Sequence, residues 1–508
     1  MGAALDAIDR VVASVTDPTD RRQQRAAVAL VSASLIDDVV FGDRADELGG
    51  AADGQLVATG IGASPGLGIG VVCEDIDSVF VAADAGREPV LLLDTTSPAD
   101  EVAMRLSAAV VTRGGGMTSH AAIVARHLGL PAVCGVGTLA LAAGDTVMVD
   151  GATGEVRRLD GPAVTPDGGS AEISTVLPAR LQDLLAWGDH ISSGRLRVVA
   201  NADTAEEVAV ARSFGASGVG LARMERLVHE HRDGFEAVLA ADAAAGDRVA
   251  HVVADHVSAL CAAMVDGPIR LRLLDIAASD ISPTAHGAGD PDPSLGLRGV
   301  RLGILHEHIT RAQVRGVLLA ITDRGHPAGV TVELTVPLVS DAAEMEALRS
   351  IVDDEADRFG RQLRIGAMIE TPRACLVAPS LARQVGRFSF GTNDLTQLTY
   401  GLSRDIADSA LGAAYRRLGV WERNPFETLD TSGVTRLIAL AVESGRAVNP
   451  ALECTLCGEH AADPASIAVA LALGIGEVSV SPYRVPATRL AVAHAVSAAV
   501  TALSESMS

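Results

Sequence analysis

From residue 197 onward the sequence repeats one pattern: an apolar run, a polar residue at its end, and then a segment with helical spacing. The apolar runs are short and rich in Val, Leu and Ile, which is typical of buried strands. The predicted strands are 197–200, 218–221, 269–274, 330–338, 364–369, 387–390, 452–456 and 477–480. Eight strands, each followed by a helix, are what a (β/α)₈ barrel of the TIM type requires.

Polar side chains follow these predicted strands at the point where each strand ends. They are Asn201, Asp203, Arg223, Asp275, Glu370, Asn393, Asp394, Cys457 and Glu459. Barrel enzymes build their active sites on this face, because the loops that follow the strands converge there. Each residue taken alone could instead be a helix cap, and this holds above all for Asp203 with Thr204. Their collective placement favours an active site.

Residues 58–160 predict a separate compact α/β domain, in which Val/Leu runs at 90–93, 109–112 and 147–149 alternate with helix-like segments. A glycine-rich turn at 114–116 leads through Thr118 and Ser119 to His120, where helical apolar spacing begins. Free backbone N–H groups and the helix dipole favour an anion at such a position. His120 is therefore a candidate carrier of a phosphoryl group. The alternative is a solvated histidine at a capped helix start.

The remaining segments complete the predicted organisation of an α/β chain. Residues 1–57 look helical and Ala-rich and contain no chemical motif. Residues 161–193 mix Pro and Gly with one amphipathic stretch near 181–187, and we interpret them as an interdomain linker. Residues 194–508 are the predicted barrel.

Composition limits the functions that this chain can have. A net charge of −23 over 508 residues argues against a nucleic-acid or anionic-membrane partner. We find no apolar stretch near membrane-spanning length and no N-terminal leader, and six mostly scattered cysteines suit a reducing compartment, so we expect the cytoplasm. All 41 basic residues are arginine, which excludes a lysine-containing phosphate loop and a lysine Schiff base. Phosphate chemistry here must rely on arginine, backbone N–H groups and metal.

Two carboxylates and one thiol stand out at the predicted strand ends. Glu370 and Asp394 follow neighbouring strands and could share one hard divalent cation such as Mg²⁺, although a pair of helix caps is the alternative. Cys457 forms a C-x-x-C pair with Cys454, which could indicate a redox pair or half a zinc site. Both of those interpretations are weak, because no second pair accompanies it and the spacing points the two sulfurs to opposite faces of a strand.

The run 114–126, Gly-Gly-Gly-Met-Thr-Ser-His-Ala-Ala-Ile-Val-Ala-Arg, resembles the phosphohistidine signature of phosphoenolpyruvate-utilising phosphotransferases, with wording closest to pyruvate phosphate dikinase. The run 391–405, Gly-Thr-Asn-Asp-Leu-Thr-Gln-Leu-Thr-Tyr-Gly-Leu-Ser-Arg-Asp, also resembles the dikinase sequence. The resemblance extends from about residue 60 to about residue 493. It implies a swivelling phosphohistidine domain followed by a TIM-type barrel, and it implies that His120 is the phosphorylated residue.

The same resemblance implies roles for residues in the barrel. The segments 220–225, 272–275 and 295–299 resemble family segments in which Arg223, Arg272 and Arg298 hold the phosphate of phosphoenolpyruvate. It further implies that Gly391, Thr392 and Asn393 line the substrate, that Glu370 and Asp394 bind Mg²⁺, and that Cys457 exchanges a proton with the methylene carbon of enolpyruvate.

The sequence also departs from the family pattern. The first 53 residues cannot hold the ATP-grasp domain of the dikinase, and there is no room for the helical insertion of enzyme I. Met224 stands where the family usually has Thr, and Asp292 where it usually has Asn. We therefore predict interconversion of phosphoenolpyruvate and pyruvate by a homodimer, with a separate nucleotide-binding subunit or a phosphocarrier as the partner. The alternatives are an enzyme I-like phosphoryl donor, a non-catalytic phosphoenolpyruvate sensor, and a metal-dependent lyase or aldolase.

Overall fold

The structure is a computed structural model that describes residues 2–40, 54–96, 100–117, 119–159, 176–282, 295–407 and 410–506. The chain divides into two compact units. The first comprises Met1–Ile191, Leu402–Thr428 and Pro486–Ser497, and the second comprises Ser192–Gly401, Leu429–Val485 and Ala498–Ser508. The first unit contains His120, and the second contains the other predicted site residues.

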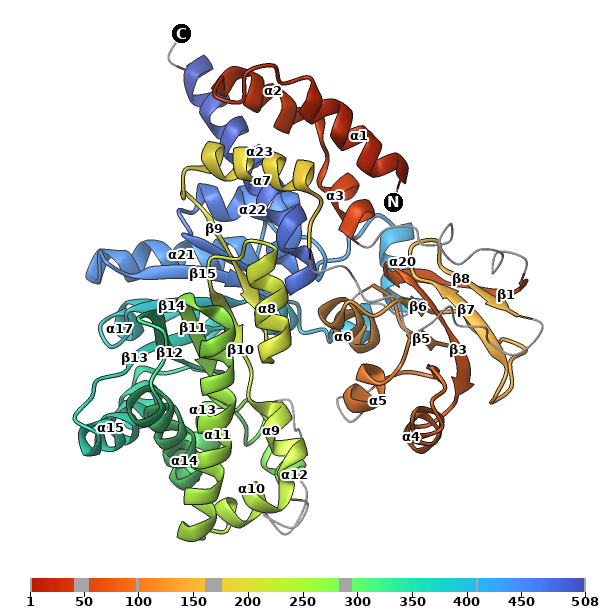
Figure 1. Cartoon of the computed structure of the whole chain (residues 1–508). Coiled ribbons are helices and arrows are strands. Elements are labelled where there is room, and N and C mark those ends of the chain that lie inside the picture. Colours follow the sequence, from red (N-terminus) through yellow and green to blue (C-terminus); the bar gives the residue numbers. More distant parts are fainter. Residues whose placement is uncertain are drawn as a thin grey trace. The chain divides into compact units, whose positions relative to one another are not determined.

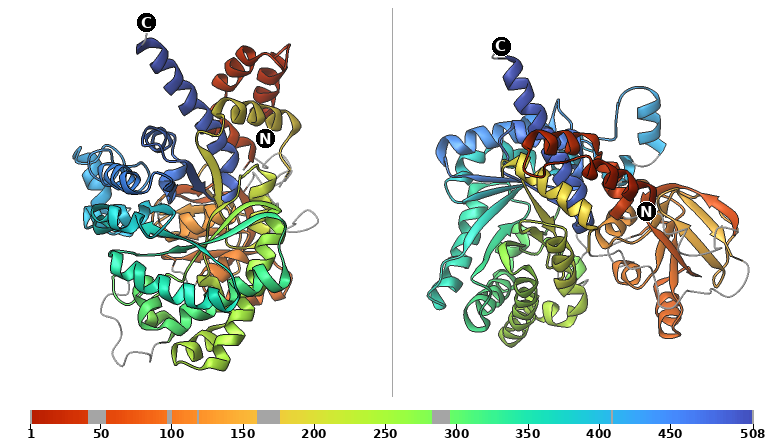
Figure 2. Two further views of the ribbon diagram at one scale, coloured as in Figure 1. Left: turned by 90° about the vertical axis from the view of Figure 1, so that its left-hand side faces the viewer. Right: turned by 45° about the horizontal axis from the view of Figure 1, so that its top comes forward.

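Eight parallel strands close into a barrel in the second unit (Figures 1 and 2). In chain order they are β9 (Arg197–Asn201), β10 (Val219–Ala222), β11 (Asp266–Arg272), β12 (Gly329–Val336), β13 (Arg364–Ile369), β14 (Arg387–Gly391), β15 (Glu453–Cys457) and β16 (Glu477–Val480). Each strand pairs with the next, and β16 pairs with β9 to close the ring. The predicted barrel is confirmed, although β11 ends at Arg272, so that Leu273 and Leu274 lie beyond the strand.

Helices surround the barrel on its outer side. The longer ones are α8 (Ala205–Ser213), α11 (Ala243–Met264), α14 (Glu307–Leu319), α15 (Ala342–Arg358), α21 (Val434–Val448) and α22 (Pro464–Ala472). Helices α11, α14 and α15 pack side by side outside strands β11 and β12 (Figure 1). Side-chain caps fix where two of these helices begin: Thr204 caps α8, and Asp341 forms a capping box with Glu344 on α15. The strands and helices thereby bring the polar strand ends to one face.

The opposite, N-terminal end of the barrel contains a buried layer of ion pairs. Arg270 donates to Glu333 at 3.3 Å and to Glu477 at 3.1 Å, and Arg387 donates to the same two carboxylates at 3.1 Å each. None of these four side chains is more than 6% exposed. Two buried cations thus share two buried anions, which keeps each charge partnered away from water.

The first unit contains a second sheet, with the strand order β1-β8-β7-β3-β4-β5-β6-β2. Its strands are β1 (Gln55–Thr59), β2 (Ile61–Ser64), β3 (Leu67–Cys73), β4 (Pro89–Leu93), β5 (Ala109–Thr112), β6 (Ala132–Cys134), β7 (Thr146–Asp150) and β8 (Glu155–Arg158). Helices α4 (Ile76–Asp84), α5 (Glu101–Arg105) and α6 (His120–Leu128) share one hydrophobic core with this sheet, and a second core lies on its other face. Residues 58–160 thus contain an α/β sheet domain of the predicted kind.

The first unit also contains further helices, among them α19 (Arg404–Ala407) and α20 (Ala410–Arg417), and five others lie near the two ends of the unit's first segment or on its last. These five are α1 (Gly2–Ala13), α2 (Arg21–Leu30), α3 (Ala33–Val40), α7 (Ala179–Ser192) and part of α23 (Val485–Ser506). His494 on α23 lies 2.9 Å from the carbonyl oxygen of Val28, and Arg489 pairs with Asp189 on α7. Helix α7 occupies the second part of the predicted linker, whereas 160–175 lie outside the described residues.

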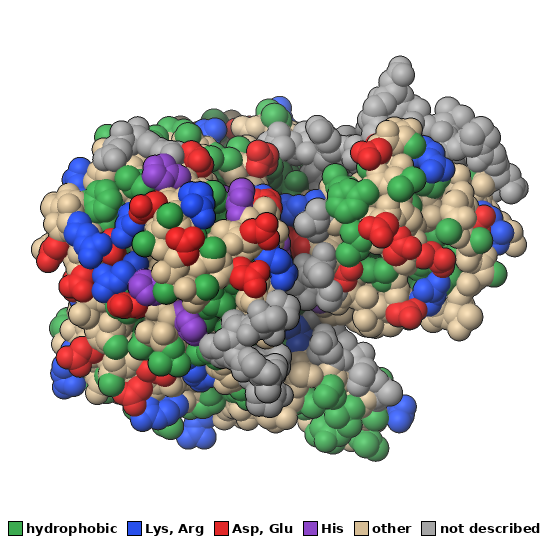
Figure 3. Space-filling view, turned by 90° about the horizontal axis from the view of Figure 1, so that it is seen from below, with side chains coloured by type: hydrophobic (Ala, Val, Ile, Leu, Met, Phe, Trp, Pro, Cys, Tyr) green, Lys and Arg blue, Asp and Glu red, His purple; other side chains and the backbone are tan. Residues whose placement is uncertain are grey.

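One segment, Pro482–Ala502, is long and apolar enough to cross a bilayer by length and composition. Half of its apolar window is buried inside the protein, as is usual for a core helix of a globular protein. On the face shown in Figure 3, arginine and acidic side chains are interspersed over the described surface. That face therefore offers no uniformly basic area for a nucleic-acid backbone.

Candidate active site

Arg223 follows strand β10 and is held by a carboxylate from the neighbouring loop. Asp203 accepts hydrogen bonds from the backbone N–H of Arg223 at 2.7 Å and from its Nε at 2.9 Å. The Arg223 side chain is 35% exposed, so it lies partly open to solvent. Thr204, and not Asp203, provides the side-chain cap of α8. Asp203 therefore binds Arg223, and the helix cap that was the alternative interpretation is provided by Thr204.

Arg272 and Arg298 are joined by one buried carboxylate, that of Asp275. Its Oδ1 accepts from Arg298 Nε at 2.8 Å, and its Oδ2 lies 3.2 Å from Arg272 Nη1. A second carboxylate, Glu225, accepts through Oε1 from Arg272 Nη2 at 2.9 Å and from the backbone N–H of Asp275 at 2.7 Å. These contacts fix both guanidinium planes before any ligand arrives, which is the arrangement that transition-state stabilisation needs.

Electrostatics follow from this pairing. Burial opposes the charge on Arg272, but Glu225, Asp275 and Glu370 raise its pKa above the ordinary value. Burial likewise opposes the charge on Asp275, yet Arg272 and Arg298 hold the pKa of this carboxyl below its usual range. The pKa of Arg298 is raised against the effect of burial, by Asp275 and then by Asp394. All three groups are therefore charged at neutral pH.

Glu370 follows strand β13 and is 1% exposed. Its Oε1 accepts a hydrogen bond of 2.5 Å from the backbone N–H of Leu338. Burial, together with the negative charges of Asp394 and Asp275, raises the pKa of Glu370 well above its ordinary value. A divalent cation between Glu370 and Asp394 would relieve this repulsion, so the donor set fits a hard cation such as Mg²⁺. No cluster of three or more Asp, Glu, His or Cys ligands occurs among the described residues, so substrate and water would supply the other ligands.

Gly391 ends strand β14 directly beside this carboxylate. A Cβ atom at this position would lie 2.5 Å from Glu370 Oε2 and 2.9 Å from Glu370 Cβ. The close approach of the backbone to the Glu370 side chain therefore requires glycine here. The next residues, Thr392, Asn393 and Asp394, form the first turn of α18 (Thr392–Tyr400). Their position at a strand end gives Asp394 a defined place next to Glu370.

Cys457 is the last residue of strand β15 and is 1% exposed. Its Sγ lies 3.1 Å from the carbonyl oxygen of Phe390 and 3.3 Å from Ser389 Oγ. Burial is the main cause that raises the pKa of this thiol to about 11, and Glu370 also raises it. The thiol is therefore protonated at neutral pH and can act as an acid. Cys454 is likewise free and buried, so the two cysteines form no disulfide.

The charged residues at the strand ends of the barrel influence one another's pKa values. Asp394 acts on both Glu370 and Arg298, while Glu370, Arg272 and Arg223 all act on the Cys457 thiol. The structure thus brings together the arginines, the carboxylates and the thiol that the sequence suggested. Asp292, the second departure from the family pattern, lies outside the described residues, and the first, Met224, is 1% exposed.

His120 is the first residue of α6 in the first unit. Ser119 caps this helix, its Oγ accepting from the backbone N–H of Ala122 at 3.4 Å. The His120 Nδ1 atom lies 2.9 Å from Thr96 Oγ1, and Thr96 follows strand β4 by three residues. Thr118 lies outside the described residues. The predicted helix N-terminus is confirmed, and the half-buried ring is oriented by a partner that the sequence pattern did not reveal.

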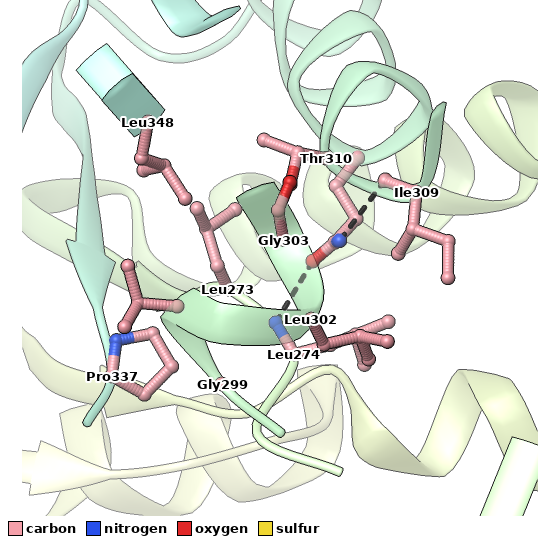
Figure 4. A pocket seen from close by; sticks show the side chains of 11 residues that line it. Leu273, Leu274, Gly299, Leu302, Gly303, Ile309, Thr310, Pro337 and Leu348 are labelled. Carbon is pink, nitrogen blue, oxygen red and sulfur yellow. Dashed lines mark hydrogen bonds between the residues drawn. The ribbon is translucent and has the colours of Figure 1, made fainter. Parts of the chain in front are cut away.

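A small cavity lies behind the segments that carry Arg272 and Arg298 (Figure 4). Leu273, Leu274 and Gly299 line it from the site side, and side chains of α14 line it from the other. Its volume of about 10 Å³ is enough for one water molecule. This cavity is too small for a substrate, so the functional groups at the strand ends, and not this cavity, define the candidate site.

Several residues of the site were not assigned from the sequence. Glu225 lies within a quoted motif but has no implied role, and its duty as a holder of Arg272 depends on a contact 47 residues away. The contacts of Thr96 and His460 also join residues far apart in the sequence, since Thr96 contacts His120, 24 residues away, and His460 contacts Thr392, 68 residues away. A polar residue close to a strand end was the only available signal in each case.

Comparisons with known proteins agree with this arrangement. Residues 178–497 match the family described as PEP-utilising enzyme, PEP-binding domain, and residues 86–154 match PEP-utilising enzyme, mobile domain. The chloroplastic pyruvate, phosphate dikinase of Flaveria trinervia is 32% identical over 97% of this chain and 55% of its own length. The pyruvate, phosphate dikinase of Rickettsia typhi is 34% identical over 86% of this chain and 54% of its own length.

The chain belongs to the family of phosphoenolpyruvate-utilising enzymes, because the match to the PEP-binding domain alone covers well over half of it. It spans about half the length of the curated dikinases that it matches. Among solved structures, a malate synthase from Haloferax volcanii aligns over 58% of this chain and 68% of its own, with 13% identity and a TM-score of 0.33. That likeness is too weak to bear on function.

Proposed function

We propose that this chain is a phosphotransferase of the pyruvate phosphate dikinase type, which interconverts phosphoenolpyruvate and pyruvate through a phosphohistidine on His120. The observation that carries the proposal is that Arg272, Glu370 and Cys457 all lie at the C-terminal ends of strands of one parallel barrel. Cationic, acidic and proton-donating groups are the three that this reaction needs. The family membership and the similarity to dikinases support the same assignment.

The proposed reaction begins with phosphoenolpyruvate at the barrel mouth. Arg223, Arg272 and Arg298 bind the phosphoryl oxygens and stabilise the charge that spreads over them during transfer. Because Thr96 contacts Nδ1 of His120 at 2.9 Å, we assign Nε2 as the attacking atom. A P–N bond forms as the P–O bond to the enol oxygen breaks, and the electron pair stays with the enolate.

Cys457 then donates its Sγ proton to the methylene carbon of the enolate and gives pyruvate. Its buried position keeps the proton on sulfur at neutral pH, since the pKa of the thiol is about 11. Glu370 and Asp394 would hold Mg²⁺, which when bound supplies positive charge for the enolate oxygen. Gly391 keeps the space beside Glu370 open, and Thr392 and Asn393 belong to the same strand-end segment.

The domain roles follow from the same proposal. Residues 58–160 would be the mobile phosphohistidine domain, 161–193 the linker, 194–508 the phosphoenolpyruvate-binding barrel, and 1–57 a helical segment without an assigned role. For the second half-reaction we propose a nucleotide-binding subunit or a phosphocarrier protein as the partner of His120. A homodimer in a reducing compartment, such as the cytoplasm, agrees with six free cysteines.

Labelling with ³²P-phosphoenolpyruvate and Mg²⁺ tests the proposal. Wild-type protein should acquire an acid-labile label and release pyruvate, whereas His120→Ala should do neither. A phosphoenolpyruvate sensor would bind the ligand without acquiring label, and an enzyme I-like donor would lose its label to a phosphocarrier protein. Persistent labelling of His120→Ala would contradict the assignment of the nucleophile.

A further inference from the structure

His460 is a fully buried histidine for which the proposed reaction has no use. It lies in the short 3₁₀ helix η4 (Glu459–Ala462), which follows strand β15, and its exposure is 0%. Its Nδ1 atom is 2.7 Å from Thr392 Oγ1, on the loop after the neighbouring strand β14. Thr392 Oγ1 is in turn 2.8 Å from the carbonyl oxygen of Cys457. The three residues form a hydrogen-bonded chain between two loops of the site.

The direction of this chain follows from donor counting. A peptide carbonyl oxygen can only accept, so the single hydroxyl proton of Thr392 must point at the Cys457 oxygen. The Thr392 oxygen is then an acceptor toward His460, and Nδ1 must carry a proton. The contact therefore selects the imidazole form in which Nδ1 is the donor. It also commits the Thr392 hydroxyl to a partner within the protein.

Two further contacts hold the same pair of loops together. The backbone N–H of Glu459 donates to Asn393 Oδ1 at 3.3 Å. Gly458 has a φ of +101°, and a Cβ atom there would lie 2.4 Å from Thr392 Oγ1 and 3.1 Å from Asn393 Oδ1. The loops thus meet without space for a side chain at Gly458. Their separation is set by this packing and by the chain that starts at His460.

These two loops carry two different functional groups. The first turn of α18 carries Asp394, and the end of β15 carries the Cys457 thiol. We propose that His460 is a positioning residue that, through Thr392, sets the place of the Cys457 proton donor relative to the carboxylates that would hold Mg²⁺. The inference rests on the proposed function, because it concerns the protonation step of that reaction.

Five variants separate hydrogen bonding from mere bulk. His460→Leu removes the donor. His460→Asn retains an N–H donor near the Nδ1 position, whereas His460→Gln carries its amide near the Nε2 position. Thr392→Val removes the hydroxyl at constant volume and keeps a variant available should His460→Leu fail to fold. His251→Leu is the matched control, because His251 is exposed on α11 and its Nδ1 atom lies 2.8 Å from the carbonyl oxygen of Asp247 in the same helix.

Exchange of the methyl protons of pyruvate with D₂O, in the presence of Mg²⁺, reports the proton transfer alone. In this exchange the Cys457 thiolate takes a methyl proton, the resulting S–H group exchanges its proton for a deuteron from D₂O, and the S–D group returns the deuteron to the enolate carbon. We expect His460→Leu, His460→Gln and Thr392→Val to lower the maximal exchange rate roughly 10- to 100-fold, the penalty of a misplaced group, with little change in the KM for pyruvate. His460→Asn and His251→Leu should stay near the wild-type rate.

Two more measurements make the result decisive. His460→Leu combined with Thr392→Val should be no slower than either single variant, because both break one chain. Amide hydrogen exchange of residues 458–463 should quicken in His460→Leu and not in His460→Asn, whatever the activity. Three results would overturn the inference. They are exchange of the pyruvate methyl protons at the wild-type rate in His460→Leu, equal exchange rates in His460→Asn and His460→Gln, and unchanged amide protection of residues 458–463 in His460→Leu. If the wild-type protein does not exchange the methyl protons of pyruvate, but the variants show the expected pattern of amide protection, the result would count against the proposed function and not against the role of His460.

Discussion

Replacing Glu477 by glutamine removes one negative charge from the buried end of the barrel while keeping the size of the side chain. Glu477 is 2% exposed and contacts Arg270 at 3.0 Å, Arg387 at 3.1 Å and Arg197 at 2.6 Å, and it accepts from Thr455 Oγ1 at 2.8 Å. The substitution leaves the two buried guanidinium groups of Arg270 and Arg387 with less negative charge around them than their own positive charge. Removal of one partner from a buried ion pair usually costs about 3–5 kcal/mol.

The structure places the expected loss at the lower end of that range. Glu333 still accepts from Arg270 and Arg387 in the variant, so neither cation is left alone. We therefore expect a loss of about 3 kcal/mol in the free energy of unfolding of the barrel. Glu453→Gln is the matched control, since Glu453 contacts the same Arg387 but is 42% exposed. It should cost at most about 1 kcal/mol.

Denaturant titration followed by far-ultraviolet circular dichroism measures both losses. Trp187 and Trp421 belong to the first unit, so tryptophan fluorescence serves as an internal reference rather than as a probe of the barrel. The pKa of Glu477 is below its ordinary 4.5, because Arg270 and Arg387 outweigh the effect of burial. The stabilisation from the ionised Glu477 side chain is full above pH 4.5, and it is lost as the pH falls through the lower pKa that this group has in the folded protein. The stability of Glu477→Gln should therefore lack this part of the dependence on acid pH. Equal destabilisation by both variants would refute the argument from burial.

Three further predictions concern the active site. Thr96→Val should slow ³²P labelling of His120 roughly 10-fold by freeing the ring, while Thr96→Ser keeps the contact; equal rates would contradict an orienting role. Because burial raises the pKa of the Cys457 thiol to about 11, pyruvate formation should persist above the pH at which an ordinary thiol ionises and fall only toward pH 11; a pH–rate profile that falls near pH 8.5 would argue against this donor. Gly391→Ala places a methyl group 2.5 Å from Glu370 Oε2 and should raise the Mg²⁺ concentration needed for half-maximal labelling, with circular dichroism as the folding check; an unchanged requirement would contradict metal binding there.

The barrel was predictable because its strands are short, mostly buried and largely apolar, and most of them are followed by a polar residue at the same end. The end of β11 was placed too late, since Leu273 and Leu274 are as apolar as the strand that precedes them. Both are buried. Leu273 still donates from its backbone N–H to the carbonyl oxygen of Thr335 on β12 at 3.0 Å, whereas the backbone N–H of Leu274 donates to Gln313 on α14 at 2.9 Å. Hydrophobicity reports burial and cannot tell which element provides it.

Long-range polar contacts were out of reach for a different reason. Arg270 and Glu477 read as ordinary charged residues within strands, and their pairing across the barrel interior joins positions 207 residues apart. No local pattern distinguishes them from solvent-exposed charges. The role of His460 depends on Thr392, which lies 68 residues away in the first turn of α18. Residue type, spacing and the family resemblance thus gave the candidate reacting groups, whereas the groups that hold them required the structure.

The arginines of the site show why those holding groups matter. Asp203 partners Arg223, Glu225 partners Arg272, and Asp275 bridges Arg272 and Arg298. Three cations thus face three carboxylates before any substrate binds, so attraction for a phosphate cannot come from excess charge alone. It must come from the N–H groups that remain, aimed by bonds already made. A guanidinium can satisfy a carboxylate with some donors and a phosphate with others, which an ammonium cannot do in fixed directions. In a chain with no lysine, the proposed phosphate site would therefore depend on orientation more than on net charge.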